Sequence, residues 1–156
     1  MVTIKIPGAF TLNIKHVLLD FNGTIAVDGR LVQGVGHKIN DLAQNLDFHV
    51  ITADTFGSVK KEIKGLKCSL KVIPEQDQVQ AKRDYLETLG KDKTIAAGNG
   101  ANDESMLREA VLGIAVLGQE GLASKTLAAS DIMVMNILDL FGYLEHPGRL
   151  VACLRR

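Results

Sequence analysis

The sequence predicts a layered α/β protein built around a mainly parallel sheet. Short apolar runs rich in β-branched residues alternate with amphipathic helical stretches along all 156 residues. No linker, low-complexity segment or internal repeat interrupts this alternation. Such a pattern is typical of parallel strands joined by helical crossovers. We therefore expect one three-layer α/β/α domain over residues 1–156, with a Rossmann-like core.

The first two β-like runs, 2–6 and 10–14, are expected to form an antiparallel hairpin ahead of the main sheet, because Pro7 and Gly8 supply a turn between them. The strands of the main sheet are expected at 16–20, 48–52, 68–73, 94–97, 113–117 and 131–135. Helices are expected at 36–47, 55–65, 76–90, 102–110, 121–129 and 136–144.

Two of these segments carry further local signals. In the stretch 76–90, Gly90 is a typical helix stop, and four residues recur on a helical period: Val79, Arg83, Leu86 and Leu89. In residues 24–32 ("TIAVDGRLV"), Asp28-Gly29 separates two short β-like runs and predicts a tight hairpin. This hairpin follows the strand 16–20 directly, so it would stand over the end of that strand.

Composition excludes several classes of function. Eighteen basic and eighteen acidic side chains cancel, and the chain has no Trp and two Tyr, so no nucleic-acid or anionic-membrane surface is expected. No apolar run approaches the ~20 residues of a membrane helix, and there is no signal-peptide pattern. Cys68 and Cys153 show neither zinc nor disulfide spacing. We expect a cytoplasmic protein.

Polar residues gather where the predicted strands end, which is where parallel α/β sheets bind ligands. They are Asp20 in "DFNGT", Thr52 and Asp54 on either side of Ala53 in "TAD", and Asn99, Asn102 and Asp103 in "GNGAND". Lys82 lies near the middle of the helix 76–90. Each has an ordinary alternative explanation, as a turn residue, a helix cap or a solvated lysine. Together they would converge on one edge of one sheet.

Phosphoryl transfer is the chemistry that requires this combination, since it needs a nucleophile, cations and small hydrogen-bond donors around one phosphorus atom. Asp20 would attack and form an aspartyl-phosphate. Thr52 and the backbone amides around Gly23 and Thr24 would hold phosphoryl oxygens. Lys82 would screen the charge between Asp20 and the phosphate.

The order of these motifs resembles that of the haloacid dehalogenase superfamily, and most closely the phosphorylation domain of P-type ATPases. That domain carries Asp-Lys-Thr-Gly-Thr, Thr-Gly-Asp, Lys and Gly-Asp-Gly-x-Asn-Asp, where this chain has "DFNGT", "TAD", Lys82 and "GNGAND". The stretch "LGIAVLGQEGLASKTLAASDIMV" is similar to the ATPase form "GIAMG…AKEAADIVL", and the tail "HPGRLVACLRR" suits small soluble P-type-ATPase-like proteins. The resemblance covers roughly residues 16–135.

The resemblance implies a Mg²⁺-dependent phosphatase with the hairpin 24–32 as its flap. The intervals from Asp20 to Thr52 and from Thr52 to Lys82 are too short for a mobile cap domain, so the site would be open. An open site suits a phosphorylated small molecule or a phosphoprotein, or closure by a neighbouring subunit of a homo-oligomer. Ala53 would join Thr52 in binding phosphate, with Asp54 and Asn102 in support.

The chain departs from the superfamily pattern at two positions. Asn22 stands where phosphatases usually carry the acid–base Asp, whose help is typically worth about 10²–10⁴-fold in rate. Asn99 stands where a metal-ligating Asp is usual, which removes one negative charge and weakens metal binding. The expected Mg²⁺ ligands are the Asp20 side chain, the Asn22 main-chain carbonyl and the Asp103 side chain, with Asn99 as a further ligand.

Three functions are compatible with these residues. The first is a slow, Mg²⁺-dependent phosphatase or phosphotransferase that acts through Asp20. The second is a regulator that binds phosphate or a phosphoprotein without useful turnover. The third is an interaction protein in which the motifs are relics.

Overall fold

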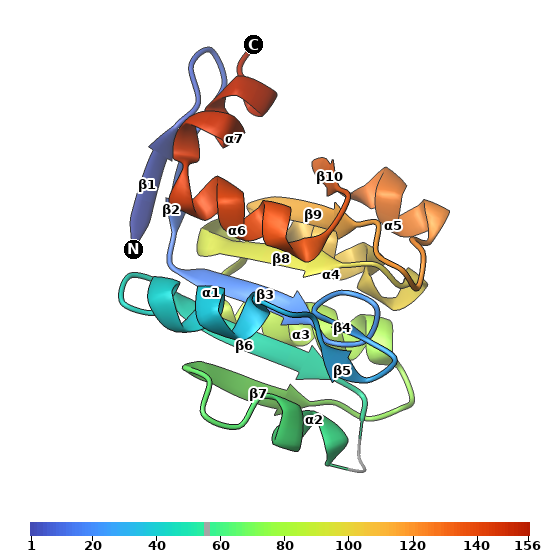
Figure 1. Cartoon of the computed structure of the whole chain (residues 1–156). Coiled ribbons are helices and arrows are strands. Elements are labelled where there is room, and N and C mark those ends of the chain that lie inside the picture. The colour runs from blue at the N-terminus through green and yellow to red at the C-terminus, as the bar shows by residue number, and fades with distance from the viewer. Residues whose placement is uncertain (55–56) are drawn as a thin grey trace.

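A six-stranded parallel sheet forms the centre of the molecule (Figure 1). The computed structural model describes residues 1–54 and 57–156. The strand order is β10-β9-β8-β3-β6-β7, and every neighbouring pair is parallel, as predicted. The strands are β3 (His16–Asp20), β6 (Asp47–Thr52), β7 (Cys68–Val72), β8 (Thr94–Gly98), β9 (Leu112–Val116) and β10 (Ile132–Val134).

Helices cover both faces of this sheet, which confirms the three-layer α/β/α class (Figure 1). They are α1 (Val35–Leu42), α2 (Ser58–Glu62), α3 (Gln78–Leu89), α4 (Glu104–Glu109), α5 (Ser124–Ala129), α6 (Ile137–Glu145) and α7 (Pro147–Leu154), with short 3-10 turns at Lys91–Lys93 and Ala101–Asp103. In β3, Val17 and Leu19 pack into the larger apolar cluster and Leu18 into the cluster on the opposite face. Burial on both faces explains why this strand is an uninterrupted apolar run.

Several helices differ in extent from the sequence expectations. The helix expected at 36–47 ends at Leu42. The helix expected at 55–65 begins outside the described residues, and its described part is α2, which follows Gly57. Helix α7 was not expected from the tail sequence, although Pro147 in its first turn is a favourable helix start.

Helix α3 buries only part of the face that its sequence period indicated. Leu86 is buried and Leu89 is half-buried, whereas Val79 is 42% exposed and Arg83 is also exposed. Lys82, a candidate site residue, is the other buried residue of the helix. Gly90 ends the helix as expected, with a positive φ of 90°.

Both predicted hairpins are present. β1 (Val2–Lys5) and β2 (Thr11–Ile14) pair antiparallel in a separate two-stranded sheet. β4 (Ala26–Val27) and β5 (Arg30–Leu31) form the second hairpin, hereafter the flap (residues 24–32). Asp28 and Gly29 have φ of 50° and 73° between them, which is the conformation that a type I′ turn requires.

Carboxylates from two other segments hold the flap. The Asp28 N–H donates to Glu120 Oε1 at 2.8 Å, and the Leu31 N–H donates to Glu62 Oε2 at 2.9 Å.

Across residues 1–54 and 57–156, no helix has the length and apolarity needed to span a membrane.

A chain of polar side chains crosses β3, β6 and α3. His16 Nδ1 lies 3.1 Å from His49 Nε2, and His49 Nδ1 lies 3.0 Å from the Tyr85 hydroxyl. Burial lowers the pKa of His49, and the neighbouring His16 lowers it further against the opposing effect of Asp47. Burial also lowers the pKa of His16, again opposed by Asp47. Both imidazoles are therefore held in the neutral form by the fold.

We expect this histidine pair to make stability fall in mild acid. The folded-state pKa of each ring lies below the unfolded value of about 6.5. The unfolded chain therefore binds more protons than the folded protein in mild acid, and acid stabilises the unfolded state relative to the folded one. The contribution is complete above about pH 6.5 and is lost as the pH falls through the folded-state pKa. Urea unfolding at about pH 7.5 and about pH 5.5 measures it, and His49→Gln should shrink the difference. The same difference in both proteins would contradict this assignment.

Candidate functional site

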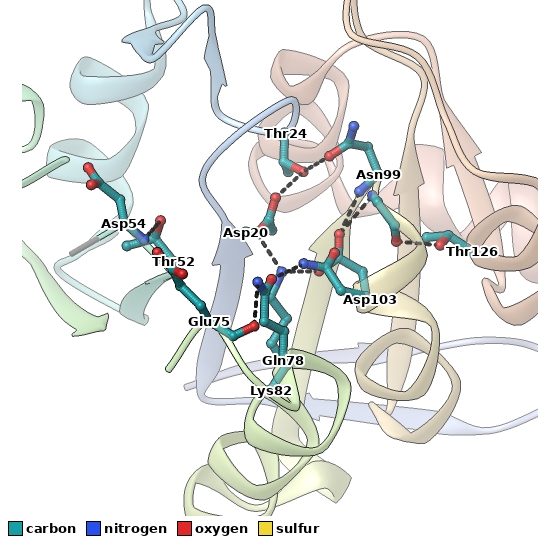
Figure 2. Close-up of polar contacts among 12 residues, drawn as sticks. Asp20, Thr24, Thr52, Asp54, Glu75, Gln78, Lys82, Asn99, Asp103 and Thr126 are labelled. Carbon is teal, nitrogen blue, oxygen red and sulfur yellow. Dashed lines mark hydrogen bonds and ion pairs between the residues drawn. The ribbon is translucent and has the colours of Figure 1, made fainter. Parts of the chain in front are cut away.

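A buried ammonium joins two carboxylates at the carboxyl end of the sheet. Lys82 Nζ donates to Asp20 Oδ1 and to Asp103 Oδ1, each at 2.6 Å (Figure 2). Lys82 is 1% exposed and Asp103 is fully buried. Asp20 is the last residue of β3, Lys82 lies on the buried face of α3, and Asp103 ends the 3-10 turn after β8. Three segments far apart in sequence therefore meet at one charge.

Burial determines the electrostatics of this group. Burial, followed by the Asp103 carboxylate, raises the pKa of Asp20 to about 7, while Lys82 and the Thr24 hydroxyl oppose the rise. Burial by itself lowers the pKa of Lys82, but the attraction of both carboxylates and their hydrogen bonds outweighs it, and the net shift is upward. The charged form of Lys82 is therefore favoured, and an additional cation beside Asp20 would favour the ionised form of that carboxylate.

Asp103 uses both of its oxygens to organise the loop after β8. Its Oδ2 accepts hydrogen bonds from the Asn99 N–H at 3.0 Å and the Gly100 N–H at 2.9 Å, while Oδ1 accepts from Lys82. A Cβ at Gly98 would lie 2.4 Å from Asp103 Oδ2, so only glycine allows the carboxylate to sit there. Asp103 thus has the geometry of a structural anchor for this loop.

Thr24 and Asn99 connect the flap to the same loop. The Thr24 hydroxyl lies 3.2 Å from Asp20 Oδ2 and 3.0 Å from Asn99 Oδ1. Asn99 Nδ2 donates to the Gly121 carbonyl at 3.0 Å, a bond that requires an amide at this position. Gly23 has φ of 77°, and a Cβ there would lie 2.3 Å from Asn99 Nδ2. Close contact with the Asn99 side chain therefore excludes a larger residue at Gly23.

The backbone amides of Gly23 and Thr24, which were expected to hold phosphoryl oxygens, donate hydrogen bonds within the turn that leads into the flap. The Gly23 N–H donates to the Ala26 carbonyl at 2.8 Å, and the Thr24 N–H donates to the Phe21 carbonyl at 3.3 Å. Thr24 also places its hydroxyl beside Asp20.

Residues at the end of β6 lie on the other side of Asp20 (Figure 2). Thr52 is 2% exposed, and its Oγ1 accepts a hydrogen bond from the Asp54 N–H at 3.1 Å. Asp54 Oδ2 accepts from the Ser58 hydroxyl and from the Val59 N–H, so Asp54 holds the start of α2. Ala53 is half-buried against the smaller apolar cluster.

Of the remaining predicted residues, Asn102 supports the loop after β8 and Asn22 lies on the surface. Asn102 Nδ2 donates to Gln78 Oε1 at 2.6 Å, which ties the loop after β8 to the first turn of α3. Asn22 is exposed at the start of the flap turn. Sequence reasoning missed Gln78 and also Thr126, whose buried hydroxyl donates to the Gly100 carbonyl at 2.6 Å. Both contacts join segments distant in sequence and have no local pattern.

The side-chain atoms that could bind a metal at this edge of the sheet are mainly oxygens. The carboxylate of Asp20 and the amide oxygen of Asn99 both lie beside the Thr24 hydroxyl, and oxygen atoms of these kinds are the ligands that Mg²⁺ prefers. Within the described residues, no group of three or more His, Cys, Asp or Glu side chains is placed to hold a metal. A cation here would therefore depend on neutral oxygens as well as carboxylate.

Two curated proteins of Methanocaldococcus jannaschii are similar to the chain in sequence. The uncharacterized protein MJ0073 is 48% identical over 79 residues, which cover 48% of this chain and 85% of that protein. A soluble P-type ATPase-like phosphatase is 29% identical over 122 residues, which cover 75% of this chain and 44% of that protein. No family model matches the chain.

Solved structures share the fold over most of their length. A hydrolase of the HAD superfamily, subfamily III A, from Legionella pneumophila aligns with TM-score 0.69 and 18% identity, covering 90% of this chain and 88% of that one. The 3-deoxy-D-manno-octulosonate 8-phosphate phosphatase of Moraxella catarrhalis, in complex with magnesium, phosphate and KDO, aligns with TM-score 0.67 and 20% identity. That alignment covers 92% of this chain and 94% of that one.

The two carboxylates are expected to differ in their effect on stability. Asp103→Asn should lower the free energy of unfolding by about 1–3 kcal/mol, because one amide oxygen cannot accept from both Lys82 and the loop amides. Asp20→Asn should not lower it, because the amide still accepts from Lys82, donates to Thr24 and removes an excess negative charge. Urea unfolding in the presence of a chelator measures both. Equal losses in the two variants would show that Asp103 is no more of an anchor than Asp20.

Proposed function

Because the chain belongs by fold to the haloacid dehalogenase superfamily and by sequence to the same family as MJ0073, we propose that it is a phosphatase or phosphotransferase that works through an aspartyl-phosphate on Asp20. The contact of Lys82 with Asp20 is the observation that carries this proposal. A buried ammonium 2.6 Å from the carboxylate neutralises it, so that a phosphate group can approach without repulsion between two anions.

The reaction has two steps, and this chain supplies the nucleophile and the charge. An oxygen of Asp20 forms a bond to phosphorus while the bond from phosphorus to the leaving oxygen breaks. The leaving oxygen takes its proton from water, because the amide of Asn22 has no titratable proton. Water then attacks the phosphorus of the aspartyl-phosphate, and the bond from phosphorus to the Asp20 oxygen breaks. The proton that this water loses neutralises the hydroxide left by the first step, so that inorganic phosphate is released and Asp20 is restored. Lys82 remains charged throughout.

Residues at the end of β6 are assigned to the phosphoryl oxygens. Thr52 would donate its hydroxyl and Ala53 its backbone amide, with Lys82 completing the phosphate-binding set. Asp54 supports this segment because it holds the start of α2. The Thr24 hydroxyl, rather than the amides of Gly23 and Thr24, orients Asp20 from the flap side.

A divalent cation, Mg²⁺ in this proposal, fits the donors beside Asp20. The Asp20 carboxylate, the Asn22 carbonyl and the Asn99 amide oxygen would hold it, and when bound it supplies charge neutralisation to the phosphoryl group. Asp103 is assigned to hold Lys82 and the 98–100 loop from behind, because it is fully buried and its Oδ2 accepts from two backbone amides of that loop. This role differs from direct ligation, which the sequence had suggested for Asp103.

The substrate class proposed is a phosphate monoester on a small molecule or a protein side chain. The similar phosphatase of Moraxella catarrhalis is bound to a sugar acid and phosphate, which supports the small-molecule case. The flap is a short hairpin rather than a domain, so the site is compatible with a bulky substrate.

Acetyl phosphate and Mg²⁺ are expected to phosphorylate Asp20. The adduct should be labile to hydroxylamine, as an acyl phosphate is, and mass spectrometry should map it to the peptide containing Asp20. Asp20→Asn is the matched control, since it keeps the shape and the contact to Lys82 while removing the nucleophile. An adduct on another residue would overturn the assignment. Phosphate or beryllofluoride binding without any adduct would instead favour the non-catalytic regulator.

Asn22→Asp is expected to accelerate turnover by up to about 10²-fold, because it supplies the acid–base carboxyl that the chain lacks. Asn22 is exposed, so an added carboxylate has room and solvation there. Steady-state hydrolysis of one accepted ester by both proteins at saturating Mg²⁺ is the measurement. Asn45→Asp, on an exposed residue outside the site, controls for added charge. An unchanged rate would mean that a missing acid does not limit this protein.

A further inference from the structure

A cavity of about 550 Å³ lies between α2 and β7, away from the contacts of Asp20. Its apolar wall is made by Ile63, Cys68 and Leu70. Ile63 is 7% exposed, so this wall is recessed behind the surface and does not protrude from it. β7 is the outermost strand of the sheet, and Figure 1 shows α2 beside it at that edge.

Lysines surround the cavity. Lys60, Lys61 and Lys64 line it, and Lys67 directly precedes Cys68, the first residue of β7. All four are exposed. Glu62 is the one acid in residues 57–72, and its carboxylate accepts a hydrogen bond from the Leu31 N–H. In a chain of zero net charge, this segment is therefore a concentrated positive patch.

We propose that this α2–β7 recess, defined by Ile63, Cys68 and Leu70 with the surrounding Lys60, Lys61 and Lys64, binds an acidic peptide segment that inserts one apolar side chain. The lysines attract the acidic residues, and the recessed wall accepts the apolar group. Full burial of a leucine side chain is worth about 1.5–3 kcal/mol, which gives the recess a preference beyond charge. This binding does not depend on phosphoryl transfer at Asp20.

Other anionic partners fit the recess less well. Single-stranded nucleic acids bind through aromatic side chains that stack on bases, and no aromatic residue lines this cavity among the described residues. Anionic membranes bind surfaces from which apolar side chains protrude, whereas Ile63 is buried in the wall. A peptide can place a single side chain in a recess and keep its charges outside.

The test uses the whole protein and a fluorescent peptide in which one leucine lies between two runs of glutamate. Replacing that leucine by glycine should weaken binding by about 10-fold, and replacing the glutamates by lysines should abolish it. Bound peptide should also slow alkylation of Cys68, which lines the recess, but not of the exposed Cys153 in α7.

Charge reversal provides the matched comparison. Lys60→Glu with Lys64→Glu should abolish peptide binding, while Lys5→Glu with Lys125→Glu, exposed lysines elsewhere, should leave it unchanged. Circular dichroism confirms that both variants are folded. Equal binding of the leucine and glycine peptides, or equal binding by both variants, would overturn the proposal. The proposal would also be overturned if the unchanged protein bound no peptide but did bind anionic phospholipid vesicles or an RNA oligomer, and if the Lys60/Lys64 variant lost that binding.

Discussion

The arrangement of the site depends on one buried cation. Lys82 is almost inaccessible to water and faces Asp20 and Asp103 at 2.6 Å. A buried charge without a partner costs several kcal/mol, so Lys82 requires an acidic partner, and its two hydrogen bonds join all three side chains. This requirement fixes β3, α3 and the loop after β8 relative to one another. The ends of these segments can then present oxygen atoms at a constant spacing.

The loop after β8 and the flap are held to the rest of the structure in different ways. The loop after β8 is tied to its own backbone by Asp103, to α3 by Asn102 and to α5 by Thr126. The flap is held by the carboxylates of Glu62 and Glu120. The contacts of Asp103 in the loop after β8 are buried, whereas the contacts of the flap lie nearer to solvent. Local opening of this region is therefore expected to begin at the flap, which leaves the ion group intact.

The sequence allowed the sheet to be predicted, together with the convergence of Asp20, Lys82 and Asp103 at one edge of it, because strand period and strand ends are local features. It also indicated the flap, because Asp28-Gly29 suits a single turn type. The assignment of Asp103 as a metal ligand did not anticipate that two backbone amides and Lys82 would take its oxygens. Contacts such as that of Thr126 with Gly100 depend on tertiary structure, and no pattern within one segment reveals them.

The bond from Asn99 to the Gly121 carbonyl has an evolutionary consequence. An ancestor with aspartate at this position would have needed another donor in place of the amide, or a different orientation of the Gly121 peptide. Once the loop had settled on the amide, a return to aspartate would bring two acceptor oxygens together. Asn99 and the orientation of the Gly121 peptide thus depend on each other, and a carboxylate at position 99 would be tolerated only together with a change in this loop.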